Sequence, residues 1–162
     1  MTTFATLVEL DLDDTRHAQG LLQLLEHYAL DPMGGGAGLK PQAREGLVAA
    51  LRAVPGYHAA LAFEGPEAVG LINCFTGFST FAARPLLNIH DVVVRADRRG
   101  RGIGQALLAW AEREARRLGC CKLTLEVLSN NRRAMASYRA AGFVPYELDP
   151  GAGQAVLLQK AL

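Results

Sequence analysis

A stretch rich in arginine and glycine, Arg98–Gln105, carries the residue types best suited to chemistry in this chain. Its three glycines alternate with other residues, so the backbone can turn tightly and approach a ligand closely. A helical pattern of apolar residues begins at Ile103, and the first amides of a helix have no partners within it. They lie at the positive end of the helix dipole, where anions bind. Together with three arginines, these amides predict a site for an anionic group such as a pyrophosphate.

A dinucleotide-binding loop is one alternative interpretation of this stretch, and it requires G-x-G-x-x-G directly after a strand. Gly102 and Gly104 fit the first two positions, but the third falls on Leu107. Five residues also separate the preceding valine run from Gly100. In that interpretation Glu126 would be the acid that binds the ribose. A glycine-rich turn without a ligand is the other alternative, and the density of arginines argues against it.

The segments on either side of the loop show strand and helix periodicities. The expected strands are Ala5–Leu10, Tyr57–Phe63, Ala68–Thr76, Leu86–Arg95, Cys121–Leu128, Phe143–Glu147 and Gln154–Lys160. The expected helices are Thr15–Tyr28, Pro41–Val54, Ile103–Leu118 and Asn131–Ala141. Strands dominate the middle of the chain and strand–helix alternation its end, which indicates the α+β class with a mixed sheet.

Composition limits the class of protein. The chain has 162 residues, of which 50% are apolar and 20% charged, so we expect a single domain over residues 1–162 with a buried core. The net charge is only +1, but eleven basic and four acidic side chains lie between residues 95 and 139. Residues 1–94 hold ten acidic and five basic side chains. The basic segment suits a polyanionic ligand and the acidic segment a cationic one. The nearly neutral whole is a poor match to nucleic-acid binding.

Cysteine usage and hydropathy indicate where the protein works. Three cysteines, two of them adjacent, fit neither a disulfide framework nor a metal site. No apolar run approaches the roughly 20 residues that span a bilayer, and the first ten residues lack the features of a signal peptide. We therefore expect a cytoplasmic protein that binds no membrane. A homodimer through a sheet edge or the C-terminal strand is compatible with these features.

Two blocks of the sequence resemble the signatures of the GNAT superfamily of acyl-CoA-dependent N-acetyltransferases. The first is D-V-V-V at residues 91–94, followed by R-x-x-G-x-G from Arg99 to Gly104. The second is L-E-V at residues 125–127, followed by N-x-x-A-x-x-x-Y-x-x-x-G-F from Asn131 to Phe143. The resemblance covers roughly residues 86–146. It implies a GNAT-like mixed, mostly antiparallel sheet of about 6–7 strands, flanked by helices and splayed between the fourth and fifth strands.

The resemblance also implies acetyl-CoA as the cosubstrate, without a metal. The backbone of Val92–Val94 would pair with the pantetheine arm, Asn131 would contact that arm, and the glycine loop would hold the pyrophosphate. The implied cofactor-binding residues are Val92, Val93, Val94, Arg99, Gly100, Arg101, Gly102, Ile103, Gly104, Gln105, Asn131 and Tyr138.

Acyl transfer to an amine requires that the ammonium group lose a proton, and the departing thiolate benefits from gaining one. The family places its general acid at the position of Tyr138, which we therefore expect to protonate the thiolate. The base is open: Glu126 stands where some members carry their proton acceptor, and His90 is a histidine, the residue type that serves most often as a general base. A third possibility is that neither acts and that water carries the proton. Strand alternation predicts that His90 and Val92 share one face, opposite Asp91, which we expect to accept a structural hydrogen bond.

These residues predict direct transfer of an acetyl group from acetyl-CoA to a primary amine of a small molecule or a protein. No G-x-S-x-G pattern or Ser-His-Asp order offers a nucleophile for a covalent intermediate. The competing classes are a non-catalytic acyl-CoA sensor or interaction module and a dinucleotide-binding protein. The presence of both Tyr138 and Glu126 argues against the sensor. Acidic residues in Glu9–Asp14 suit an amine-bearing acceptor.

Overall fold

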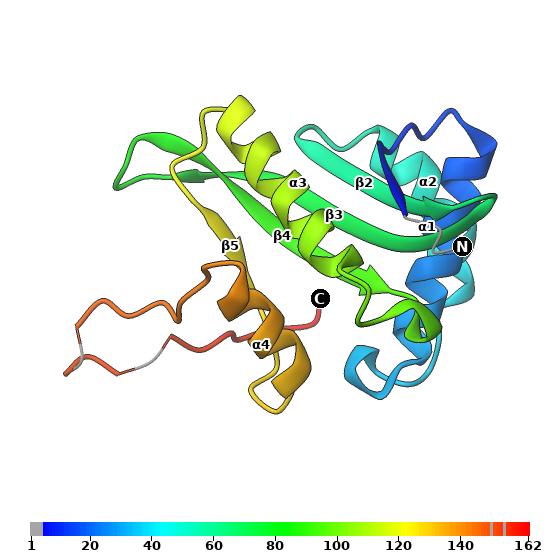
Figure 1. The fold of residues 1–162 in the computed structure, drawn as a ribbon. Coiled ribbons are helices and arrows are strands. Elements are labelled where there is room, and N and C mark those ends of the chain that lie inside the picture. The colour runs from blue at the N-terminus through cyan, green and yellow to red at the C-terminus, as the bar shows by residue number, and fades with distance from the viewer. Residues whose placement is uncertain (1–4, 150, 154) are drawn as a thin grey trace.

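One open sheet forms the centre of the structure, a computed structural model that describes residues 5–149, 151–153 and 155–162. Its five strands follow the order β1-β2-β3-β4-β5 (Figure 1). They are β1 (Thr6–Glu9), β2 (Tyr57–Glu64), β3 (Glu67–Ser79), β4 (Arg84–Val94) and β5 (Leu123–Leu125). Neighbours from β1 to β4 are antiparallel, whereas β5 runs parallel to β4.

Helices cover both faces of this sheet. In the described residues they are α1 (Thr15–Leu30), α2 (Pro41–Arg52), α3 (Ile103–Arg117) and α4 (Arg132–Ala140), with two 3-10 turns, η1 (Pro32–Gly34) and η2 (Ala96–Arg98). Figure 1 shows α3 on one face and α1 with α2 on the other. Asp14 caps α1, and the Asn131 side chain caps α4 by accepting from the amide of Ala134 at 3.2 Å. None of the helices in this part of the chain combines the length and apolar character needed to cross a membrane.

The two faces of the sheet carry separate cores. The α3-side core joins α3 to side chains of β2, β3 and β4, whereas the α1-side core joins α1 and α2 to the opposite face of the same strands. The α3-side core contains Ala60, Ala62, Val69, Ile72, Cys74, Leu87, Ile89, Ile103, Leu107, Leu108, Ala111 and Ala115. The α1-side core contains Leu21, Leu24, Leu51, Leu61, Phe63, Ala68, Leu71 and Val93.

Gly70 on β3 has no side chain, so α3 can approach the sheet closely. A Cβ atom built on Gly70 would lie 2.8 Å from Cγ2 of Ile103 and 3.1 Å from Cδ1 of Leu107. Both residues belong to the first two turns of α3 and are buried. The position of the α3 N-terminus relative to β4 therefore depends on this contact.

The α+β fold class and the mostly antiparallel mixed sheet are confirmed, but the number of strands differs from the expected 6–7. The expected strand Phe143–Glu147 has no strand structure, and its Pro145 has no amide to donate to a ladder. The expected strand Gln154–Lys160 is not observed either. Residues 155–162 have no strand structure, and Gln154 lies outside the described residues. In Figure 1 the chain after α4 extends away from the sheet and turns back past that helix.

The fifth strand is shorter than the expected Cys121–Leu128, and this opens the sheet. β5 pairs with β4 only at Leu87, Asn88 and Ile89. The last five residues of β4 therefore have no strand beside them on that edge in the described chain, which is the splay that the resemblance implies.

We expect Gly70→Val to destabilise the protein by about 1–3 kcal/mol, because the added side chain must push α3 away from β3. Gly46→Ala is the matched control: Gly46 lies inside α2 with no atom within 4 Å of a built Cβ. That change should stabilise the helix by about 0.5–1 kcal/mol. Urea unfolding of the two variants measures both effects, and an unchanged midpoint for Gly70→Val would show that α3 does not pack as described.

Candidate active site

The loop between β4 and α3 presents unpaired amides, as its glycines predict. Gly100 and Gly102 have φ values of 80° and 81°, in the left-handed region that favours glycine. The first helical hydrogen bond of α3 runs from the amide of Ala106 to the carbonyl of Gly102 at 3.0 Å. The amides of residues 103–105 therefore have no partner within the helix and are available to an anion.

These amides open into a cavity of about 370 Å³ between β4, α3, α1 and α4. It brings together most of the residues that the sequence assigned to the cofactor, from segments far apart in the chain. Those lining it are Val92, Val93, Val94, Arg99, Gly100, Gly102, Ile103, Gly104, Gln105, Asn131 and Tyr138. Arg101 is not among the lining residues, and its Nη1 lies 3.9 Å from Oε1 of Glu64.

The uncovered edge of β4 supplies backbone groups to this cavity. The amide of Arg95 donates to the carbonyl of Val69 on β3 at 2.9 Å. Backbone polar groups alternate in direction along an antiparallel strand, so those of Val92 and Val94 point away from β3 towards the gap beside α4. The carbonyl of Val94 already accepts a hydrogen bond from Nε of Arg99 at 3.1 Å. The amide and carbonyl of Val92 and the amide of Val94 are left to pair with an extended ligand.

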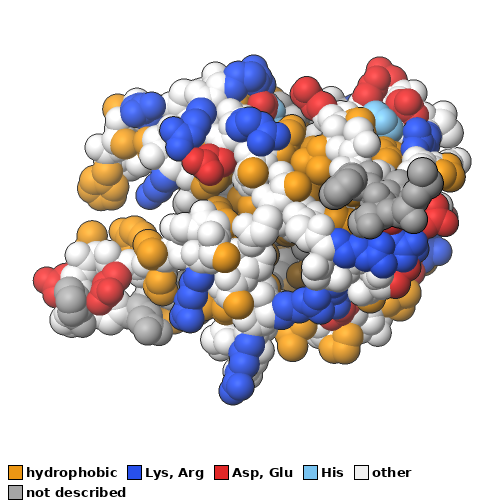
Figure 2. All heavy atoms as spheres, viewed as in Figure 1, with side chains coloured by type: hydrophobic (Ala, Val, Ile, Leu, Met, Phe, Trp, Pro, Cys, Tyr) orange, Lys and Arg blue, Asp and Glu red, His pale blue; other side chains and the backbone are white. Residues whose placement is uncertain are grey.

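The arginines of the loop are not free positive charges, which differs from their expected role in charging the anion site. Nη2 of Arg99 lies 2.9 Å from Oδ2 of Asp31, at the end of α1. Nε of Arg98 lies 2.7 Å from Oε2 of Glu64. The hydrogen bond to the Met33 amide and then the pair with Arg99 lower the pKa of Asp31, so it is ionised at neutral pH. A carboxylate therefore stands beside the anion site. Figure 2 shows Lys and Arg side chains gathered over α3 and near its N-terminal loop.

A bulge in β4 corrects the expected orientation of its polar side chains. Asn73 pairs with Asp91 and Cys74 with Ile89, so His90 is the extra residue. His90 consequently packs edge-on against Phe75 on the α1 side, with ring centroids 5.6 Å apart. The expected face shared by His90 and Val92 is wrong, because Val92 and Val94 pack on the α3-side core.

Asp91 accepts the structural hydrogen bond that the sequence led us to expect. Nδ2 of Asn73 donates to its Oδ2 at 2.9 Å. The hydroxyl of Tyr57 donates in turn to Oδ1 of Asn73 at 2.8 Å. Asn73 is only 3% exposed, so this chain of hydrogen bonds holds the Asp91 carboxylate in one orientation.

Two tyrosines face the cavity, one of which sequence analysis missed. Tyr138 is half-buried on α4 and packs edge-on against Phe143, with ring centroids 6.1 Å apart. Tyr28 lies near the end of α1 and lines the same cavity. Burial, followed by the charge of Asp91, raises the pKa of Tyr28; burial, Tyr28 and Asp91 together raise the pKa of Tyr138. Both phenols are protonated at neutral pH, the state that can donate a proton. Only the position of Tyr28 near the end of a predicted helix was visible in the sequence.

The two candidate bases lie outside the lining of this cavity. Glu126 follows β5 directly and is exposed, and His90 is exposed at the bulge.

The side chain of Gln105 connects α3 to α4. Its amide donates to the carbonyl and hydroxyl oxygens of Ser137, at 2.9 and 3.0 Å. This contact ties α4, and with it Tyr138, to the first turn of α3.

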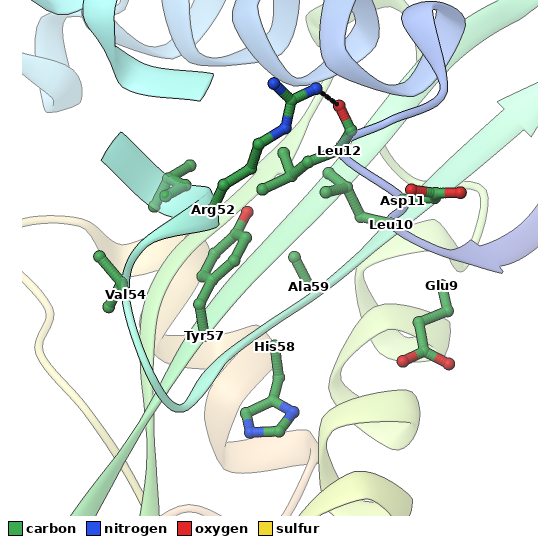
Figure 3. Close-up of a pocket in the computed structure, with 10 residues that line it drawn as sticks. Glu9, Leu10, Asp11, Leu12, Arg52, Val54, Tyr57, His58 and Ala59 are labelled. Atoms are coloured by element: carbon green, nitrogen blue, oxygen red, sulfur yellow. Dashed lines mark hydrogen bonds between the residues drawn. The ribbon is translucent and has the colours of Figure 1, made fainter. Parts of the chain in front are cut away.

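A larger hollow of about 510 Å³ lies at the other end of the sheet, between the ends of β1 and α2 and the start of β2 (Figure 3). Tyr57 and His58 point to opposite faces of β2 there. Its basic groups are partnered: Nη2 of Arg52 donates to the carbonyl of Leu12 at 2.6 Å, and Nδ1 of His58 lies 2.9 Å from Oε1 of Glu114. None of the predicted site residues lines it. Among the described residues, no group of three or more His, Cys, Asp or Glu could hold a metal ion.

Comparison with known proteins agrees with this arrangement. Residues 21–143 match the sequence model of the Acetyltransferase (GNAT) family. An aminoalkylphosphonate N-acetyltransferase of Salmonella typhimurium is 36% identical over 89 residues, which are 55% of this chain and 58% of that protein. A thialysine N-epsilon-acetyltransferase of Bos taurus is 34% identical over 96 residues, 59% of this chain and 53% of that protein. The chain thus spans about half the length of the curated relatives it matches.

A solved structure extends the likeness of the fold to the whole chain. An aminoglycoside acetyltransferase from an uncultured soil metagenomic sample superposes with a TM-score of 0.78, covering 99% of this chain and 98% of that one, at 19% identity. At this identity the likeness concerns the fold alone. Because the family match includes both sequence blocks and the whole of the cavity lining on β4, α3 and α4, the chain belongs to the acetyltransferase (GNAT) family.

Proposed function

We propose that this protein transfers an acetyl group from acetyl-CoA directly to a primary amine. The observation that supports this most is the single cavity in which the free amides of α3, the open edge of β4 and Tyr138 meet. Each feature serves one part of the reaction, namely binding the diphosphate, aligning the pantetheine arm and protonating the thiolate.

The family uses acetyl-CoA as its cosubstrate, and the residues of this site fit that molecule. A Cβ built on Gly100 or Gly102 meets no atom within 4 Å, so the space beside the loop is open to a diphosphate. The free amide and carbonyl of Val92 match the alternating amides of a pantetheine arm, as a neighbouring strand would. Acetyl-CoA supplies an activated acetyl thioester. The chain's own groups then bind, orient and exchange protons with the reactants.

Tyr138 is the proposed general acid because its phenol is protonated, half-buried and inside the cavity. Its edge contact with Phe143 and the Gln105–Ser137 contact fix α4 and limit the positions that the hydroxyl can occupy. Glu126 and His90 are the proposed bases, and their exposure favours proton transfer through water over direct contact. Transfer without a covalent intermediate needs no nucleophile from the protein.

The direct test combines cofactor binding with turnover. We expect CoA and acetyl-CoA, but neither NAD nor NADP, to raise the melting temperature. Release of free thiol from acetyl-CoA should then depend on an added amine, for which the relatives suggest a panel containing an aminoalkylphosphonate, thialysine and streptothricin. Stabilisation by CoA without any amine-dependent thiol release would instead indicate a non-catalytic acyl-CoA sensor.

Replacing the proposed acid tests the chemical step. Tyr138→Phe should lower kcat by about 10- to 100-fold, because the thiolate must leave without a proton donor. CoA affinity should remain nearly intact, since the ring still packs on Phe143. The matched control is Tyr146→Phe, at a tyrosine that is 65% exposed. Equal kcat values for Tyr138→Phe and the wild type would remove the acid assignment.

A pair of substitutions at one position tests the diphosphate site. Gly104 is a helical residue whose built Cβ would lie 3.8 Å from Cγ2 of Val94, an ordinary contact. Gly104→Ala should therefore bind CoA much as the wild type does and stabilise α3 by about 0.5–1 kcal/mol. Gly104→Glu should abolish CoA binding, because a carboxylate then stands where the diphosphate would lie. Calorimetric titration of both variants decides, and CoA binding by Gly104→Glu would place the diphosphate elsewhere.

The carboxylate of Asp31, beside the glycine loop, should weaken CoA binding. We expect Asp31→Asn to tighten CoA binding by about 2- to 5-fold, since it removes a competing anion and frees Arg99. The new amide can still accept the hydrogen bond from the Met33 amide. Calorimetry at low and moderate salt measures the change, with Glu112→Gln on the exposed side of α3 as control. Weaker CoA binding by Asp31→Asn would mean instead that Asp31 orients Arg99 for the cofactor.

A further inference from the structure

Asp91 differs from every other acidic residue that the structure describes. The other acids either lie within 4.0 Å of a basic side chain or are exposed. Asp91 is half-buried, and no Lys, Arg or His of the described chain lies within ion-pair distance of it. A partly desolvated carboxylate is more favourable with a cation beside it than without one, and a cation from outside the chain could fill that place.

Only one oxygen of this carboxylate is used by the protein. Oδ2 accepts from Asn73, which Tyr57 holds in turn. No hydrogen bond to Oδ1 is present among the described residues, and every fully buried side-chain oxygen there has a partner. Oδ1 is therefore accessible, and the hydrogen bonds to the other oxygen fix the direction in which it is presented.

Asp91 is not among the residues that line the cavity, but it directly precedes Val92, which is. Its charge adds to burial in raising the pKa of Tyr28 on α1 and of Tyr138 on α4, and both tyrosines line the cavity. After the bulge at His90 the register is regular, so Asp91 lies on the same face of β4 as Val93, the α1 side. The position therefore combines a fixed negative charge, an oxygen that the protein leaves unshared and a lining residue of the cavity as its chain neighbour.

We propose that Asp91 binds the ammonium group of the acceptor, and that Asn73 and Tyr57 are positioning residues that hold its carboxylate for this purpose. The inference rests on the proposed acetyl transfer and specifies the acceptor's chemical class. An aliphatic amine, which is protonated at neutral pH, supplies the missing cation, whereas an arylamine or an alcohol does not. The ion pair brings the nitrogen beside Tyr138 before the nitrogen loses its proton.

The first test is kinetic and uses the panel amine with the fastest turnover. Asp91→Asn, which keeps the shape of the side chain, should raise KM for that amine by about 10-fold or more while changing kcat and CoA affinity little. Tyr57→Phe should raise KM by about 2- to 5-fold, because Asn73 is then held less firmly. The matched control Glu45→Gln, at an exposed acid of α2, should leave KM unchanged. Propyltrimethylammonium, a cation that cannot be acetylated, should compete with the amine in the wild type but not in Asp91→Asn.

Two results would overturn the inference. One is an unchanged KM in Asp91→Asn. The other is a fall in kcat at constant KM together with an altered pH–rate profile, which would make Asp91 the base and not the binding group.

A second test separates this inference from the proposed function. If no amine is acetylated, propylammonium is titrated into the CoA-bound, isotopically labelled protein and followed by NMR. Saturable shifts at residues 90–92 that Asp91→Asn abolishes would support an ammonium site even without turnover. Absence of these shifts in the wild type would refute the ammonium site.

Discussion

The packing of the first turns of α3 over Gly70 is the contact on which the rest of the site depends. Ile103 and Leu107 can reach β3 only because no side chain stands between them. This close approach fixes the start of the helix at the end of β4, so the free amides of α3 and the open edge of β4 face the same cavity. Hydrogen bonds from Gln105 to Ser137 then hold α4, and with it Tyr138, against the first turn of α3.

The arginine-rich loop suggests a site charged by free arginines, but the arginines of the site are paired with acids. The arginines are engaged by acids of neighbouring elements, so they brace the loop as much as they attract an anion. In the proposed function, a diphosphate would therefore be bound chiefly by backbone amides and the helix dipole, which no side-chain rearrangement can remove. Asp91 is the opposite case, a carboxylate fixed by hydrogen bonds but left without a cation. The proposed diphosphate site and the proposed ammonium site would together suit a reaction between a polyphosphate ester and an amine.

Much of this architecture could be predicted from local sequence patterns. The glycine–arginine loop, the Asn131 cap and the strands through β4 depend on residue types within a few positions of one another, and they form as expected. The faces of His90 and Val92 could not be predicted, because simple alternation contains no bulge, and the bulge depends on how β3 pairs with β4. Tyr28 was missed because its place in the cavity depends on the packing of α1 against the sheet. The pairing of Arg99 with Asp31 joins residues 68 positions apart, beyond the reach of any local pattern.

The most direct measurement of the central claim is a crystal structure of the protein with acetyl-CoA bound. The account predicts diphosphate oxygens within hydrogen-bond distance of the amides of residues 103–105. It also predicts a pantetheine arm paired with Val92 along the open edge of β4, and a thioester sulfur next to the hydroxyl of Tyr138. A coenzyme bound elsewhere, or a fifth strand closed along the full length of β4 with no coenzyme between the strands, would contradict it.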